Sequence, residues 1–199
     1  MSATDVILKS NSSWIGGNTP CLTAGMRGTL EVEVSVTGAK RNLHAGVDGG
    51  AVIEPVSDLM LVLSTLKDAR GNVDVPRFYD GVRELSTAER SMLSATGFRI
   101  EEYRAHLGVS RLAQRTNDDV LTARWAQPSL SITAISTSNA SNAFSVMPNC
   151  ASARLSVRTV PDQSNSEVAS AIEKHLRYEF AKLRSPNQLE VSVLQVGDW

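Results

Sequence analysis

The stretch "TLEVEVSVT", residues 29–37, alternates strictly between apolar and polar side chains. Successive side chains of an extended chain point to opposite faces, so all the apolar members of this stretch share one face. These members are Leu30, Val32, Val34 and Val36. A period of two with one apolar face predicts a half-buried strand, as in an antiparallel sheet. The segment is therefore expected to be the first strand of the fold.

A helix is predicted directly after this strand and a short loop, over residues 54–72, "EPVSDLMLVLSTLKDARGN". Pro55 suits a first helical turn, where no N–H is needed for the helical ladder. Apolar residues recur at helical spacing, which predicts one buried stripe. The expected stripe consists of Val56, Leu59, Met60, Leu63 and Leu66. Gly71 and Asn72 are expected to end the helix.

The last third of the chain repeats the pattern of strands and a helix. Residues 129–136 and 152–160 alternate like strands, and the polar segment 137–144 between them is expected to be a loop. Residues 166–184 predict a long helix, and residues 188–195 alternate again. The apolar stripe of this helix consists of Val168, Ile172, Leu176, Phe180 and Leu183.

Residues of about 73–127 are less regular and predict an insertion of short helices and loops. The segment "STAE", residues 86–89, has the pattern of a capping box, and "NDDVLTARW", residues 117–125, predicts a short helix. Without the insertion, the order from Thr29 onward is β-α-β-β-α-β. This order predicts an α+β, ferredoxin-like sandwich, in which two helices cover one face of a four-stranded antiparallel sheet.

Composition places the chain among ordinary globular proteins, with 199 residues, 42% hydrophobic residues and a net charge of −1. Such a balance offers no electrostatic attraction to nucleic acid or an anionic membrane. No apolar run approaches the roughly 20 residues of a membrane helix, and the first residues lack the pattern of a secretory signal. Cys21 and Cys150 alone make neither a disulfide framework nor a cysteine-based zinc cage. We therefore expect a cytoplasmic protein.

Common catalytic motifs are missing from the sequence. There is no GxSxG elbow, and the loop "GVDGG", residues 46–50, lacks the lysine of a phosphate-binding motif. The three histidines, His44, His106 and His175, are spread along the chain rather than clustered as zinc ligands would be. For His106 and His175 an ordinary structural role is expected.

His44 differs from the other two because it precedes a glycine-rich bend, "RNLHAGVDGG", residues 41–50. Glycines there permit positive φ and the close approach of another backbone or a ligand. An imidazole in such a loop could donate a hydrogen bond to a substrate oxygen. Glycine-rich loops before helices are also common without any function, so the spacing alone leaves both interpretations open.

Several segments, taken together and in order, resemble the carnosine-dipeptidase-like branch of the di-zinc metallopeptidases. The segments are "SSWIGGNTPCLTAGMRG" (12–28), "NLHAGVDGG" (42–50), "EPVSDLMLVLSTLKDARGN" (54–72), "QPSLSI" (127–132), "SVMPNCASARLSVRTVP" (145–161) and "FAKLRSPN" (180–187). In this family a zinc-binding catalytic domain is interrupted by a ferredoxin-like lid that also dimerises. The resemblance implies that residues 1–14 are an edge strand of the catalytic domain and residues 15–25 a hinge. Residues 26–199 are then the lid and dimerisation domain, with the insertion at about 73–127.

Three positions carry implied roles. His44 matches a lid histidine that reaches into the active site of the partner subunit, binds the scissile carbonyl oxygen and stabilises the developing charge. Arg158 matches an arginine that binds the substrate carboxylate; its other interpretation is a solvated arginine on the polar face of the sheet, beside Arg154. Asn11 stands where typical members have a zinc-ligating Asp, and its neutral oxygen is a weaker ligand. A second departure is Gln195, near the place of a substrate-binding histidine.

The family's other zinc ligands fall outside the chain, so the resemblance implies zinc in a parent protein and neither metal nor hydrolysis in this chain alone. It implies a homodimer, a parent acting on dipeptides or γ-glutamyl peptides such as glutathione, and His44 supplied in trans. The segment "SNSSWIGG", residues 10–17, is similar to a divergent fungal subgroup with WD repeats that degrades glutathione with an amidotransferase-like partner. One alternative is a non-catalytic scaffold or partner subunit in a glutathione-degrading complex, which Asn11 favours. Another is a stand-alone ferredoxin-like ligand-binding domain, against which the hinge-like residues 10–25, leading from an orphan strand, argue.

Overall fold

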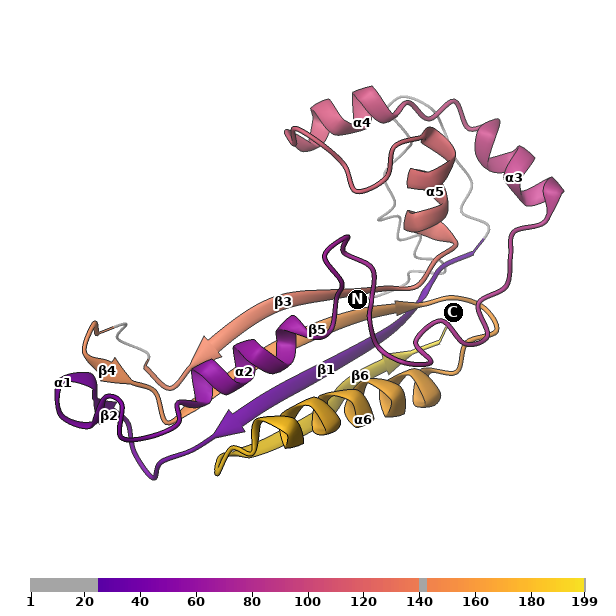
Figure 1. Ribbon diagram of the computed structural model, residues 1–199. Coiled ribbons are helices and arrows are strands. Elements are labelled where there is room, and N and C mark those ends of the chain that lie inside the picture. Colours follow the sequence, from indigo (N-terminus) through magenta and orange to yellow (C-terminus); the bar gives the residue numbers. More distant parts are fainter. Residues whose placement is uncertain (1–24, 140–142, 199) are drawn as a thin grey trace, which may run out of the picture.

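A computed structural model describes residues 25–139 and 143–198 of the protein (Figure 1). Its main sheet has four strands in the order β3-β5-β1-β6, and every neighbouring pair is antiparallel. The strands are β1 (Gly28–Thr37), β3 (Ser129–Thr137), β5 (Cys150–Thr159) and β6 (Gln188–Gly197). With the two long helices, this order confirms the predicted α+β, ferredoxin-like sandwich.

Helices α2 (Pro55–Ser64) and α6 (Asn165–Leu183) cover one face of the sheet. Helix α2 contacts β1 and β5, whereas α6 contacts β1 and β6, so each helix covers one half of the sheet (Figure 1). The buried face of β1 supplies Leu30, Val32, Val34 and Val36, which are at most 1% exposed. The predicted stripe of α6 also lies toward this core: Val168, Ile172 and Leu176 are buried, and Phe180 and Leu183 pack against it.

The other face of the sheet carries polar side chains. Glu33 forms an ion pair with Arg154 across β1 and β5, with Nε and Oε1 3.5 Å apart. One place further along the same face, Ser156 donates a hydrogen bond of 2.7 Å to Glu31. Within the described residues, the helices that pack closely on the sheet are α2 and α6, both on its apolar face, as the alternation of polar and apolar residues predicts.

The first helix departs from its predicted length and stripe. Helix α2 ends at Ser64, because the Thr65 hydroxyl donates back to the carbonyl of Val62 at 2.7 Å and the chain then turns. Asp68 holds this turn by accepting hydrogen bonds from the backbone N–H groups of residues 70 and 72, an alternative to the helical ladder. The prediction that Gly71 and Asn72 end the helix was wrong.

The predicted stripe of this helix was also wrong at Met60, which is 51% exposed. Val62 takes a buried place beside Leu59 and Leu63. Helical spacing allows either assignment, and the side of the helix that faces the sheet is decided by packing.

The insertion contains α3 (Thr87–Ser94), α4 (Ile100–Leu107) and α5 (Asn117–Trp125). Ser86 and Glu89 form the predicted capping box at the start of α3. A separate small core joins these helices and consists of Phe98, Val120 and Leu121. Residues Val73, Val75 and Phe78, by contrast, pack into the main core. None of the helices in the described ranges is both long and apolar enough to cross a lipid bilayer.

A small unit built on two paired short strands projects from the opposite end of the sheet, beyond the end of β1 (Figure 1). It contains β2 (Leu43–His44), the single turn α1 (Ala45–Asp48) and β4 (Val146–Met147). Strands β2 and β4 pair antiparallel, with His44 opposite Val146. His44 and the helical insertion therefore lie at opposite ends of the main sheet.

Candidate functional site

His44 is exposed at the tip of the projecting unit, where β2 ends and α1 begins. Its Nδ1 accepts a hydrogen bond of 3.1 Å from the backbone N–H of Gly46. A ring nitrogen that accepts carries no proton, so a neutral imidazole in this position carries its proton on Nε2. The Nε2–H group is then free to donate to a group outside the loop.

The glycines after His44 serve separate purposes. A Cβ at Gly46 would lie only 3.1 Å from His44 Cε1, so glycine leaves room for the imidazole ring. A Cβ at Gly49 would lie 2.3 Å from the carbonyl oxygen of Ala45, which no side chain tolerates. Of the three, only Gly50 has a positive φ, of 79°. Close approach therefore accounts for Gly46 and Gly49, and a positive φ accounts for Gly50.

Asn42 holds the base of the His44 loop against the strands that follow it. Its Oδ1 accepts from the Ser138 hydroxyl at 2.7 Å and from the Asn149 backbone N–H at 3.0 Å. Directly after His44, the N–H of Ala45 donates to the carbonyl of Ser145 at 2.8 Å. These bonds tie the loop to both sides of β4, which limits the freedom of an otherwise exposed imidazole.

Arg158 lies on the open, polar face of β5, opposite Thr29 of β1 and Ser129 of β3. Its side chain is half-buried, and Nη1 donates a hydrogen bond to the Thr29 hydroxyl. Arg154, four residues earlier on the same face of β5, is exposed and pairs with Glu33. Arg158, in contrast, has no carboxylate partner within the described ranges. The guanidinium can therefore still bind an anion.

The structure keeps His44 and Arg158 apart. Arg158 pairs with Thr29, near the start of β1. His44 lies beyond the other end of β1, past the pair formed by Thr37 and Cys150. At about 3.3 Å per residue, the run of β5 from Cys150 to Arg158 alone spans about 26 Å. The third predicted site residue, Asn11, lies outside the described residues.

The other two histidines have no catalytic setting. His175 of α6 contacts Thr65 twice, with Nε2 at 2.9 Å from the hydroxyl oxygen and at 3.2 Å from the carbonyl oxygen. These contacts join α6 to the end of α2. His106 is exposed in the last turn of α4. In the part of the chain that the structure describes, no three His, Cys, Asp or Glu side chains gather closely enough to hold a metal ion.

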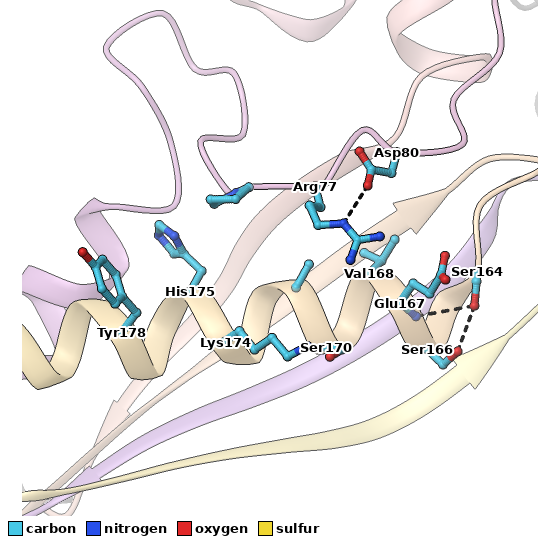
Figure 2. Close-up of a pocket in the computed structure, with 12 residues that line it drawn as sticks. Arg77, Asp80, Ser164, Ser166, Glu167, Val168, Ser170, Lys174, His175 and Tyr178 are labelled. Carbon is cyan, nitrogen blue, oxygen red and sulfur yellow. Dashed lines mark hydrogen bonds and ion pairs between the residues drawn. The ribbon is translucent and has the colours of Figure 1, made fainter.

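A groove of about 500 Å³ runs along α6, between this helix and the loop of residues 76–80 (Figure 2). Arg77 and Asp80 pair across its rim at 2.8 Å, and Ser164 caps the start of α6 by accepting from the N–H of Glu167. The ring of His175 is directed to Thr65 rather than to a serine of the groove. Arg77 and Asp80 are therefore paired with each other, and no nucleophile and base are brought together among the lining residues.

Two arginines near Arg158 were not predicted as site residues. Nη1 of Arg27 donates to the carbonyl of Gln127 at 3.1 Å and reaches the Ser129 hydroxyl at 3.4 Å. Burial lowers the pKa of the Arg27 guanidinium, and the positive charges of Arg158 and Arg124 lower it further. No sequence motif joins these residues, because only the pairing of β1, β3 and β5 brings them together.

The sequence of the chain matches a known protein family. Residues 24–184 match the model of the peptidase dimerisation domain of M20 peptidases. The chain is 33% identical over 196 residues to the Cys-Gly metallodipeptidase DUG1 of Candida albicans, with 98% of this chain and 40% of that protein covered.

Two solved structures share the fold over nearly the whole chain. The dipeptidase Dug1p of Saccharomyces cerevisiae superposes with a TM-score of 0.90 at 33% identity, covering 95% of this chain and 40% of that one. Human carnosine dipeptidase 1 gives a TM-score of 0.89 at 32% identity, with the same coverage of 95% and 40%. The chain thus spans about two fifths of the length of each of these three relatives. It belongs to the family of M20 peptidase dimerisation domains.

Proposed function

We propose that the chain is the lid and dimerisation domain of a metallopeptidase-like parent protein and supplies His44 to the active site of a partner subunit. Relatives of the chain are named as dipeptidases for Cys-Gly and carnosine. The proposed substrates of the parent are accordingly dipeptides or γ-glutamyl peptides such as glutathione. The observation that carries the proposal is the separation of His44 from Arg158 along the sheet.

This separation argues for action in trans. A dipeptide at full extension spans only about 7 Å, whereas Arg158 lies beside the start of β1 and His44 lies beyond its other end. One chain therefore cannot place both residues on the same small peptide. Two chains can, provided that the His44 end of one lies beside the Arg158 end of the other.

The edge strand β3 offers that arrangement. It begins at Ser129, beside Arg158, and ends at Thr137, close to the base of the His44 loop. If β3 pairs antiparallel with its own copy about a twofold axis, each start meets the partner's end. Each His44 then approaches the Arg158 of the other chain, and two equivalent sites form.

The surface of β3 supports this choice of edge. The strand contains no charged residue and no proline, which are the usual protections against pairing at an edge. Ile132 and Ile135 are 41% and 49% exposed on it. Met60 and Leu61, at 51% and 54% exposed, are further exposed apolar side chains on α2, the helix that covers β5 next to β3. A second copy of the chain would bury these side chains.

In the proposed site His44 acts as a hydrogen-bond donor. The Gly46 N–H occupies Nδ1, which leaves Nε2–H to face the scissile carbonyl oxygen of a peptide held by the partner subunit. A preplaced donor stabilises the negative charge that develops on this oxygen during attack by water. Arg158 of the partner subunit would bind the peptide carboxylate with its planar fork.

A metal in the parent, for which we propose zinc, would supply the activated water; relatives of the chain are named as metallodipeptidases. The described residues do not fit a metal centre, because no suitable cluster of ligands occurs among them. We assign the ligands to the rest of the parent, with residues 1–14 as an edge strand of the catalytic domain and residues 15–25 as a hinge. The lid then covers residues 26–199, with its insertion at about 73–127. We also propose a cytoplasmic location, which the low cysteine content favours.

A non-catalytic parent is the second candidate, and Asn11 favours it. A neutral amide at a family carboxylate position weakens metal binding, and a scaffold that binds an amidotransferase-like partner needs no complete metal site. Metal analysis and peptidase assays of the full-length protein distinguish the two, with Asn11→Asp as the test variant. Two bound metal ions and peptidase activity in the unmodified protein would exclude the scaffold, whereas metal and activity gained only by Asn11→Asp would favour it.

Mixing two inactive variants of the full-length protein tests the action in trans. His44→Ala and Arg158→Ala should each reduce kcat/KM about 100-fold or more. When the two variants are unfolded together, refolded and assayed, half of the dimers are mixed, and each mixed dimer has one intact site. We expect about a quarter of the original activity to return, as isologous pairing requires. No recovery, with mixed dimers present by mass spectrometry, would place both residues in one subunit's site and contradict the proposal.

A further inference from the structure

Three arginines converge where the insertion joins the main sheet. Arg158 stands between Thr29 and Ser129 in the register, and Arg27 reaches Ser129 from just before β1. The hydrogen bond from Arg27 to the carbonyl of Gln127 ties it to the connection between α5 and β3. Arg27 and Arg158 therefore lie around the same residue, Ser129, on the polar face of the sheet.

Arg124 approaches this area from α5. Its guanidinium lies over the ring of Tyr103, 4.5 Å from the centroid, and 5.6 Å from the centroid of Trp125. Stacking on aromatic faces orients the guanidinium. Its N–H groups, which lie in the plane of the guanidinium itself, remain available as hydrogen-bond donors. The insertion thus contributes an oriented cation to the end of the sheet that holds Arg158.

The three charges are not neutralised by the described part of the chain. None of the three arginines forms an ion pair there. Of the carboxylates on the same face of β1, Glu33 pairs with Arg154, and Glu31 accepts from Ser156 rather than from an arginine of the cluster. Arg158 and Arg124 are close enough to Arg27 for their charges to lower its pKa, in addition to the larger effect of burial. Half-buried like charges repel one another, and an anion between them removes the repulsion.

We propose that Arg27 and Arg124 extend the carboxylate site of Arg158 into a site for two carboxylates, which selects peptides with an acidic C-terminal residue. This inference rests on the proposed function, which assigns only the α-carboxylate of the peptide to Arg158. The side-chain carboxylate of a C-terminal Glu or Asp lies close to that α-carboxylate. Arg27 is placed to bind it, since its Nη1 reaches Ser129, the residue paired with Arg158. Arg124 approaches from α5, which ends just before β3 begins at Ser129.

The test compares Gly-Glu with Gly-Gln, which have nearly the same shape and differ by one negative charge. Binding is measured by calorimetry on the full-length protein after removal of metal by a chelator, so that no peptide is turned over. We expect Gly-Glu to bind about tenfold more tightly than Gly-Gln. Arg27→Gln and Arg124→Gln should each reduce this ratio to about twofold or less, and Arg27→Lys, which keeps the charge but not the fork, should give an intermediate ratio.

The matched control is Arg111→Gln, which removes one positive charge from an exposed loop of the insertion. It should leave the ratio at about tenfold, and thermal unfolding should show that all the variants are folded. Equal binding of the two peptides by the unmodified protein, or a ratio that Arg27→Gln and Arg124→Gln do not change, would overturn the proposal. It would mean that a carboxylate of the parent protein neutralises the cluster.

Assays of the metal-loaded protein separate this inference from the proposed function. Hydrolysis with a preference for Gly-Glu that falls in Arg27→Gln would support both. Absence of hydrolysis, with the binding preference for Gly-Glu intact, would contradict the proposed hydrolase and support the two-carboxylate site. Hydrolysis of both peptides at the same kcat/KM, with equal binding, would support the hydrolase and overturn the two-carboxylate site.

Discussion

Asp58 accepts a hydrogen bond of 2.7 Å from the side-chain amide of Asn187, a residue 129 positions away in the sequence. Asp58 is only 3% exposed, and its carboxylate also accepts from the hydroxyl of Ser185. The amide of Asn187 donates in addition to the carbonyl of Ile53, at 3.1 Å. One buried carboxylate thus joins the start of α2, the turn before β6 and the last part of the loop that carries His44.

Asp58→Ala should destabilise the domain by about 2–3 kcal/mol, because it leaves two donors near a buried position without their charged acceptor. Urea denaturation followed by circular dichroism measures the change in the free energy of unfolding. Asp74→Ala is the control, since this exposed carboxylate has no side-chain partner in the described ranges. A loss no larger for Asp58→Ala than for the control would show that the network does not stabilise the fold.

Patterns among nearby residues predicted the strands and the second long helix. The alternation of Leu30 to Val36 and the stripe of α6 depend only on the spacing of neighbours, so they could be recognised without the fold. The end of α2 could not, because it depends on hydrogen bonds that Thr65 and Asp68 make once the chain turns. Asp58 is polar within an apolar stripe, and its partners become visible only when the chain is folded.

The site residues, too, could be predicted from the sequence only where they form a local pattern. His44 could be noticed because a glycine-rich bend is a local feature, and its hydrogen bond from Gly46 is local too. Arg27 lies next to a linker-like segment without any motif, and its proximity to Arg158 and Arg124 depends on strand register. Residues that act together across strands therefore remained separate in the sequence.

Gly46→Ala should reduce kcat of the full-length protein about tenfold or more, because the new Cβ would press on the His44 ring at 3.1 Å and turn Nε2–H away from its target. The free energy of unfolding should change little or increase, since alanine is favoured over glycine in a helix. Val47→Ala, in the same turn and 78% exposed, is the control and should keep full activity. Equal kcat values for the Gly46→Ala and original proteins would show that the ring position is not set by Gly46.

Glu89 makes the insertion sensitive to acid. Hydrogen bonds from the Arg83 guanidinium and from Ser86 hold the pKa of the Glu89 carboxyl far below its ordinary value of 4.5. A group with a lowered pKa in the folded state stabilises that state above its unfolded pKa, and the contribution is lost as the pH falls toward the folded pKa. The stabilisation should therefore be complete at pH 7 and decrease steadily below about pH 4.5.

Glu89→Gln should consequently reduce the amide-exchange protection of α3 about fivefold at pH 7. The difference from the original protein should narrow as the pH is lowered to about 2.5, where the carboxyl loses most of its advantage over the amide. Hydrogen exchange measured by mass spectrometry on peptides covering residues 87–94 gives both values. Glu84→Gln, an exposed neighbour, should have no effect, and a Glu89→Gln difference independent of pH would show that charge is not the cause.

Ile135→Glu should convert the proposed dimer into a monomer, because pairing of β3 with its copy would bury an unpaired carboxylate at a cost of several kcal/mol. Sedimentation at tens of micromolar measures the mass of the chain, and the original protein should give twice the monomer mass of 21.4 kDa. Val193→Glu on the opposite edge strand β6 is the matched control, since Val193 and Ile135 are 50% and 49% exposed. This control should remain dimeric if β3 is the paired edge. Dissociation by Val193→Glu alone would place the interface at β6, the strand furthest from β3 in the sheet. The proposed pairing of β3, which brings each His44 to the partner's Arg158, would then be contradicted.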